Sequence, residues 1–142
     1  MKYLITITDE HTVDGEKESS EAMLTGTLNV FADSYKIRYR EVSEGLEDCF
    51  VTLKYDENRN NVEMTRTGSY NTQMLMEKHC RHTCVYMTPA GRIDLGVYTN
   101  DIYSDMNEDG GTLKFSYSLD INGELLSENR LTLTLKKTEV EK

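Results

Sequence analysis

The sequence predicts an all-β protein, a closed antiparallel β-barrel of about 8 to 10 strands connected mostly as a meander. Apolar and polar residues alternate with a period of two along most of the chain, whereas a helical period is almost absent. Turn-forming residues separate the alternating stretches at short intervals. Short strands with no helix to cover them bury their apolar faces on one another, in a barrel or a sandwich. We favour the barrel, because the strands of a meander close naturally and leave no exposed edge.

The C-terminal hairpin is the clearest element. In 113–121, apolar or aromatic residues occupy every second position, and lysine, serine and aspartate lie between them. This pattern is typical of a half-buried strand. Asn122-Gly123 follows directly, and this pair favours the tight type I′ turn of a two-residue hairpin. Residues 130–136 alternate leucine with polar residues, which predicts the returning strand.

The same alternation predicts the earlier elements. The first strand places Tyr3, Ile5 and Ile7 on one face. Asp14-Gly15 is expected to turn the chain, and Pro89 lies in another turn, where its missing N–H does not disturb a ladder. About nine strands are expected, including the C-terminal hairpin. In chain order they cover 2–9, 18–31, 35–39, 49–55, 62–66, 73–88, 93–103, 113–121 and 130–136.

Length and charge limit the classes of function. The chain has 142 residues, so residues 1–142 are expected to form a single domain with a real core. It is acidic, with a formal net charge of −9 and a mean hydropathy of −0.60. An acidic surface repels nucleic-acid backbones and anionic membranes, so neither is an expected partner.

The cysteine count and the N-terminal residues indicate the cellular compartment. Three cysteines cannot make a closed disulfide framework. The first ten residues do not resemble a signal peptide, and no apolar run approaches the roughly 20 residues of a membrane-spanning helix. These features predict a cytoplasmic protein.

Arg66 is the first candidate ligand-binding residue. It follows Val62 and Met64 at the same spacing, so it is expected to point into the barrel with them. A buried arginine needs acceptors, because an unpaired buried charge is very costly. Two interpretations stay open. Either Arg66 pairs with an internal carboxylate or with strand carbonyls, or lies at the barrel mouth with its stem buried, or else it anchors an acidic group of a ligand.

Tyrosines and one histidine complete the candidate site. The chain has nine tyrosines, and five of them share the spacing of apolar neighbours. They either pack in the core or line a polar, aromatic cavity. Tyr39 and Tyr117, with His82, are the expected neighbours of Arg66 in such a cavity. The five are Tyr35, Tyr39, Tyr55, Tyr86 and Tyr117.

Two segments resemble metal sites but do not predict one. Residues 105–110 match the first half of a calcium loop, but Ser116 stands where that loop needs a glutamate, so a polar hairpin loop is expected. Residues 79–84 contain two histidines and two cysteines. On one strand, Cys80 and Cys84 would lie about 13 Å apart, too far for one zinc ion, and are expected to be buried apolar residues. No metal or other cofactor is predicted.

Nothing in the chain predicts a catalytic site. It contains no nucleophile elbow, no His-Glu-x-x-His motif, no phosphate-binding glycine loop and no dinucleotide fingerprint. A pair of acidic residues that meet only in space has no fixed spacing, so the sequence does not decide whether one exists.

The order and spacing of several short motifs resemble a known family. The chain is similar to the YwiB-like family of small uncharacterised bacterial proteins, a domain of unknown function. The resemblance covers nearly the whole chain and implies a lipocalin-like, or calycin-like, closed barrel with no established activity. His79 departs from it, because such proteins often have glycine there, and this weakens a family-wide metal role. The motifs are Thr25-Gly26, 37–41, 66–68, 86–91, 93–95, 99–102, Gly111, Tyr117, 122–124 and 129–131.

Two functions follow from these observations. The first is a non-catalytic barrel that binds a small molecule in its interior or mouth, with an acidic group as the candidate partner of Arg66. The second is a protein-interaction module, such as a homodimer, with no small-molecule ligand.

Overall fold

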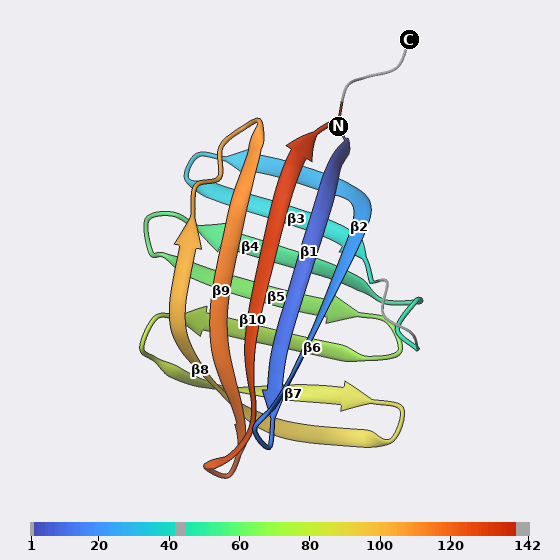
Figure 1. Cartoon of the computed structure of the whole chain (residues 1–142), viewed down its shortest axis with the longest axis vertical. Coiled ribbons are helices and arrows are strands. Elements are labelled where there is room, and N and C mark those ends of the chain that lie inside the picture. Colours follow the sequence, from blue (N-terminus) through green and yellow to red (C-terminus); the bar gives the residue numbers. More distant parts are fainter. Residues whose placement is uncertain (1, 42–44, 139–142) are drawn as a thin grey trace.

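The computed structural model describes residues 2–41 and 45–138, and these residues form ten β-strands. Every pair of neighbouring strands is antiparallel, and β1 pairs with both β10 and β2, which closes the barrel (Figure 1). The closed antiparallel barrel predicted from the sequence is therefore confirmed. The strands are β1 (Lys2–Val13), β2 (Glu16–Phe31), β3 (Ser34–Arg40), β4 (Phe50–Asp56), β5 (Asn61–Thr67), β6 (Asn71–Glu77), β7 (Arg81–Thr88), β8 (Gly91–Ser104), β9 (Gly110–Ile121) and β10 (Glu124–Lys137).

Two predicted turns have the expected backbone conformation. Asn122 and Gly123 both have positive φ, 54° and 87°, as a type I′ turn requires. Asp14 and Gly15 have φ of 53° and 79° and join β1 to β2 in the same way. Short polar residues tolerate this left-handed region, and glycine occupies it freely.

The stretch 73–88 is two strands and not one, which corrects the sequence analysis. The chain turns at 78–80, between β6 and β7, and His79 has a φ of 64°. No glycine or asparagine marks this turn, so the alternation pattern gave no sign of it.

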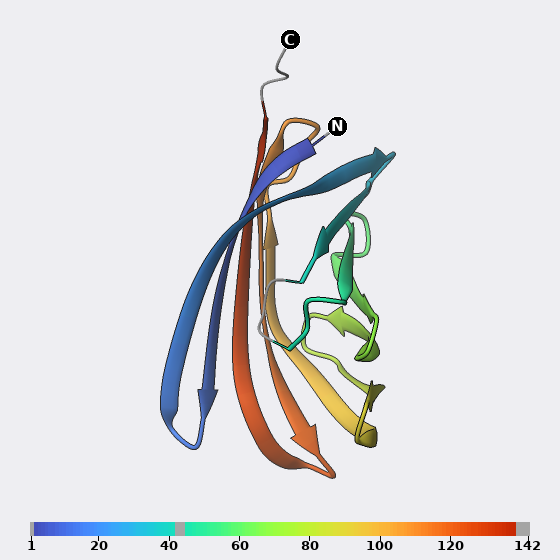
Figure 2. The same cartoon turned by 90° about the vertical axis from the view of Figure 1, so that its right-hand side faces the viewer.

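The ten strands form two walls. The long strands β1, β9 and β10 run steeply along one side, and the short strands β3 to β7 cross behind them (Figures 1 and 2). The strands β2 and β8 bend and belong to both walls. β2 pairs with β1 up to Thr27 and with β3 only from Thr27 onward. Before Thr27, β2 is therefore paired on one side only among the described strands.

Alternate residues of every wall meet inside the barrel and form one core. Apolar side chains fill the half of the interior near the start of β1, and several are completely buried, among them Ile5, Ile37, Leu53, Leu113 and Phe115. In the described part of the chain no helix is long and apolar enough to cross a membrane. Farther along β1, β3 and β5, the inward positions change from apolar to charged, and these charges surround the candidate site.

Candidate functional site

Three charged residues occupy inward positions at the same level of the barrel. Asp9 continues the inward series of β1 after Ile7, and Glu41 follows the inward Tyr39 directly after β3. Arg66 continues the inward series of β5 after Met64. Since side chains alternate along a strand, these charged groups cannot turn outward without moving their apolar neighbours too.

These residues border a cavity of about 240 Å³ in the barrel interior. One part of its lining is apolar and comes from seven strands, whereas the other part carries hydroxyl, carboxylate and guanidinium groups. Ser20 and Ala22 border it from the half of β2 that lacks a partner in β3. The apolar lining consists of Ile7, Ala22, Met64, Met74, Leu95, Leu119 and Leu131, and the polar lining of Asp9, Ser20, Tyr39, Glu41, Arg66, Thr72, Tyr86 and Tyr117.

Arg66 lines the cavity and is held by two protein groups. Its Nη2 donates to Glu41 Oε2 at 2.9 Å, and its Nη1 donates to Tyr86 Oη at 2.9 Å. Both members of the ion pair are largely buried, with side-chain exposures of 16% for Arg66 and 10% for Glu41. Burial opposes the charge of Arg66, but Tyr86 and Glu41 hold the pKa of Arg66 above its ordinary value. Arg66 is therefore charged and fixed in place.

The pairing with Glu41 bears on the two interpretations of Arg66. An internal carboxylate accepts from Arg66, as the structural interpretation expects. The Nε atom is buried and has no hydrogen-bond partner among the described residues, and its burial keeps a ligand from reaching it. A ligand acid could bind only through the remaining Nη hydrogens, beside the carboxylate of Glu41.

Asp9 is the second carboxylate of the cavity. It is partly buried, and no hydrogen bond or ion pair joins it to any residue that the structure describes. Partial burial is the largest cause that raises the pKa of Asp9 above its ordinary value of 3.8. Glu41 raises this pKa further, whereas His11 and Arg66 act against the rise. The site thus keeps a carboxylate whose lost hydration is not replaced by protein donors.

Tyr39 and Tyr117 direct free phenol groups to the same space. Tyr39 is only 5% exposed, yet its hydroxyl has no hydrogen-bond partner in residues 2–41 or 45–138. Tyr117 lines the cavity from β9 and also lacks such a partner in those ranges. Burial is the main cause that raises the pKa of Tyr39 and of Tyr117 far above the ordinary value, so both phenols stay neutral. A phenol in such surroundings normally finds a partner, and among the described residues neither hydroxyl has one, so a molecule in the cavity would supply it.

His82 lies apart from the other three predicted site residues. The structure brings together Arg66, Tyr39 and Tyr117, which all line the cavity, but His82 is not among the lining residues. Its Nε2 atom instead lies 2.7 Å from Glu77 Oε1. The stretch 73–88 turns at His79, contrary to the prediction of one strand, and this turn sets the position of β7.

The other tyrosines divide between the cavity and the core. Tyr86 lines the cavity and accepts from Arg66, whereas Tyr35 and Tyr55 do not line it. The rings of Tyr35 and Tyr55 stack with their centroids 6.2 Å apart. Tyr55 Oη donates to Asn60 Oδ1 at 3.2 Å. Both of the alternatives stated for the tyrosines therefore occur in one molecule.

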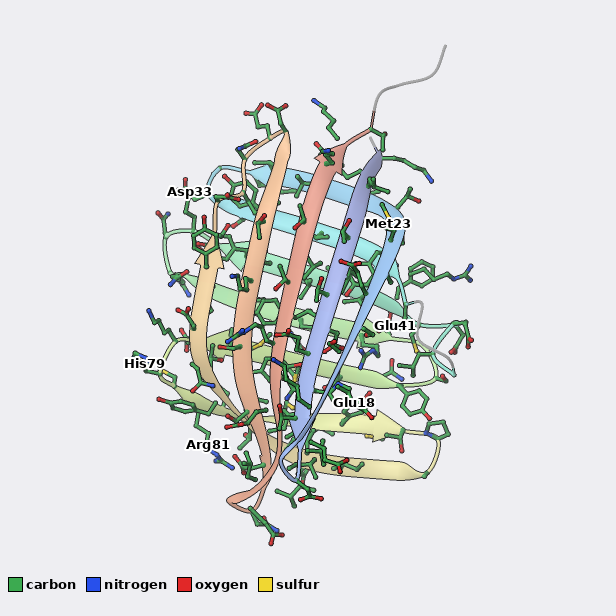
Figure 3. The ribbon with its side chains drawn as sticks, in the orientation of Figure 1. Glu18, Met23, Asp33, Glu41, His79 and Arg81 are labelled. Atoms are coloured by element: carbon green, nitrogen blue, oxygen red, sulfur yellow. The ribbon has the colours of Figure 1, made fainter. Side chains whose placement is uncertain are left out.

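The two segments that resemble metal sites have other structures. Cys80 is exposed in the turn before β7, so the expectation that it is buried was wrong, whereas Cys84 is buried, and burial raises the pKa of its thiol. His79 and Glu41 lie on opposite sides of the barrel (Figure 3). The Asp105 carboxylate accepts from the Thr112 N–H at 2.7 Å, as in a polar hairpin loop. Within the described ranges, no group of three or more His, Cys, Asp or Glu side chains is placed to hold a metal ion.

Asp9 and Glu41 are functional residues of the cavity that were not predicted from the sequence. The signal that selected Arg66 applies equally to both of them. Asp9 shares its spacing with Tyr3, Ile5 and Ile7, and Glu41 shares its spacing with Tyr39. A charged residue that extends an inward apolar series is the common feature of all three.

Comparisons with known proteins agree with this barrel. No curated protein matches the chain. The crystal structure of the ywiB protein from Bacillus subtilis is similar, with a TM-score of 0.85, 20% sequence identity and coverage of 97% of this chain and 92% of that chain. At that identity the likeness shows a shared fold. A family model described as a domain of unknown function, DUF1934, matches residues 5–133. The resemblance inferred from the sequence is thus confirmed, and the chain belongs to the DUF1934 family.

Proposed function

We propose that this protein is a non-catalytic barrel that binds one small amphipathic molecule in its cavity. The observation that carries the proposal is the hydroxyl of Tyr39. Tyr39 is only 5% exposed and lines the cavity, and its hydroxyl has no hydrogen-bond partner in the described residues. A ligand group that accepts from or donates to this hydroxyl would form a hydrogen bond worth about 0.5–1.5 kcal/mol.

The cavity has the size and lining of a site for a small metabolite. Its volume of about 240 Å³ is below the roughly 300–1,000 Å³ of sites for drug-sized ligands. It exceeds the roughly 150 Å³ of an apolar cavity that admits benzene. Lipocalins are closed barrels with a similar number of strands, and each holds one small ligand. The calycin-like character expected from the sequence is part of this proposal.

The three cysteines support a cytoplasmic location. None of them is in a disulfide, although Cys49 and Cys84 are buried and Cys80 is exposed. Proteins of oxidising compartments often stabilise small domains with disulfides. We therefore propose that the ligand is a molecule of the cytoplasm.

Binding of a neutral probe tests this proposal. 2-Phenylethanol has an aromatic body for the apolar lining and a hydroxyl for Tyr39. In amide NMR titrations we expect saturable shifts at cavity residues with a Kd in the range of about 0.1–10 mM, as expected for a ligand of this size. If no such shifts appear at millimolar concentrations, the proposal is wrong.

A variant that fills the cavity gives the matched control. Ala22 lines the cavity on β2, and its neighbour Met23 is 67% exposed and points to solvent. Ala22→Phe should abolish the saturable shifts, whereas Met23→Phe adds the same ring outside and should leave them unchanged. Equal shifts in both variants would place the probe elsewhere and contradict binding in the cavity.

A further inference from the structure

The charges of the cavity define which class of ligand it selects. The lining of the cavity contains two acidic groups and one basic group. These are the carboxylates of Asp9 and Glu41 and the guanidinium of Arg66. The guanidinium and the Glu41 carboxylate are 2.9 Å apart and neutralise each other. Asp9 remains, so the lining carries one formal negative charge in excess.

An anionic ligand would meet an unfavourable field in this cavity. It would have to approach Arg66 beside Glu41 and with Asp9 in the same lining. Two like charges in a partly dehydrated site repel each other far more strongly than they do in water. The sequence suggested an acidic ligand group as the partner of Arg66. Such a head group is therefore less suitable for this cavity than a cationic one.

A cationic head group would satisfy groups that the protein leaves without partners. An ammonium donates up to three hydrogen bonds. Asp9 offers carboxylate oxygens with no bond to another described residue, and the hydroxyls of Tyr39 and Tyr117 offer phenol oxygens. The faces of tyrosine rings also attract cations, and three tyrosines line this cavity.

On this basis, and given the proposed small-ligand binding on which it rests, we propose that the cavity selects an organic amine with an apolar body. The ammonium binds to the carboxylate of Asp9 between the phenols of Tyr39 and Tyr117. The apolar body lies on the methionine and leucine side chains of the apolar lining. The Arg66–Glu41 pair serves as a positioning element that holds Tyr86 through its hydroxyl.

Three probes of nearly equal shape test the preference for an amine. Phenethylamine is a cation at neutral pH, 2-phenylethanol is neutral and phenylacetate is an anion. We expect phenethylamine to bind about tenfold more tightly than 2-phenylethanol, as one charge-assisted hydrogen bond allows, and phenylacetate to bind more weakly than both.

Two variants separate the role of Asp9 from the total charge. Asp9→Asn should remove the tenfold preference for phenethylamine and leave the affinity for 2-phenylethanol within about twofold. Asp14→Asn removes the same charge from the exposed β1–β2 turn, where asparagine is well tolerated, and should keep the preference.

The results for the neutral probe separate this proposal from the one before it. If 2-phenylethanol binds but phenethylamine binds no more tightly, or phenylacetate binds most tightly, the amine preference is wrong and ligand binding stands. An equal loss of preference in Asp9→Asn and Asp14→Asn would also overturn the role of Asp9. If none of the three probes binds in the cavity, both proposals are wrong.

Discussion

Asp9 shows how a single inward residue can favour function over stability. The residues that precede it at the same spacing, Ile5 and Ile7, are apolar and buried, and an apolar residue at position 9 would extend the core. The carboxylate instead loses part of its hydration and receives no hydrogen bond from the described protein groups. Such a group destabilises the folded state, and residues of this kind are concentrated at binding sites.

The direction of the Asp9 pKa shift predicts a pH-dependent gain in stability for Asp9→Asn. Because this pKa is raised above 3.8, the folded protein binds the proton more tightly than the unfolded chain does. The charged form is therefore penalised at neutral pH, and the penalty disappears as the pH falls through the raised pKa toward 3.8. Urea unfolding should show Asp9→Asn more stable than the natural protein at neutral pH.

The stability difference should shrink on mild acidification. The charged groups that act on Asp9 are His11, Glu41 and Arg66, and all three are retained in the variant. Asp14→Asn provides the control, since its carboxylate is exposed and lies in the turn. A variant that is less stable than the natural protein at neutral pH would contradict the assignment of Asp9 as an unsatisfied carboxylate.

At the scale of elements, the bend of β2 allows the barrel to have two walls. The strand leaves β1 and joins β3 near Thr27, and Gly26 lies directly before this point. A Cβ atom at Gly26 would lie 2.5 Å from the carbonyl oxygen of Arg38 and 2.6 Å from the Cδ1 of Ile5. The backbone of β3 cannot move away without disturbing its own pairing, so glycine is required here for close approach.

Gly26→Ala should therefore destabilise the barrel. We expect the free energy of unfolding to fall by about 1–3 kcal/mol, the usual cost of an overpacked site. The neighbouring Thr25 is exposed, so Thr25→Ala serves as the control and should cost less than about 1 kcal/mol. Urea denaturation of the two variants measures both values. Equal stability of Gly26→Ala and the natural protein would show that β2 bends without the help of this close contact.

The whole molecule depends on pairing between the two ends of the chain. β1 pairs with β10 along ten residues, and Tyr3 lies opposite Lys137. The Thr138 N–H and hydroxyl both donate to the Lys2 carbonyl, at 3.3 and 2.9 Å. The N- and C-terminal ends of the described chain are therefore neighbours (Figure 1).

This closure predicts that a circular permutant will fold. A chain in which residues 1 and 142 are joined by a short flexible linker and which is opened between Asn122 and Gly123 keeps every strand, and β10 then becomes the first strand. We expect the β-sheet circular dichroism of the natural protein and a loss of stability of no more than about 2 kcal/mol, since only loop closures change. A permutant opened at Tyr117, inside β9, should not fold. A permutant opened at the turn that also fails to fold would contradict this account of closure.

The local features of this barrel could be read from its sequence. Alternation identified the inward face of nearly every strand, and Asn122-Gly123 identified the last hairpin, because strand period and turn conformation depend on neighbouring residues. The turn at His79 was missed, because a histidine with positive φ is stabilised by its surroundings and carries no turn signal of its own. The prediction that Cys80 is buried was wrong for the same reason, because Cys80 lies in this turn and is exposed.

Alternation along each strand determined that Arg66, Tyr39 and Tyr117 point inward. The same spacing extends to Asp9, but Asp9 was not predicted as a site residue, and the tertiary structure revealed it as part of the site. Only the tertiary structure decided that these residues meet at one level, that Glu41 neutralises Arg66, and that His82 lies outside the group. The direction of a side chain follows from its own strand, but the neighbour that it meets depends on the register between strands and the closure of the barrel. Both arise from contacts between residues distant in the chain.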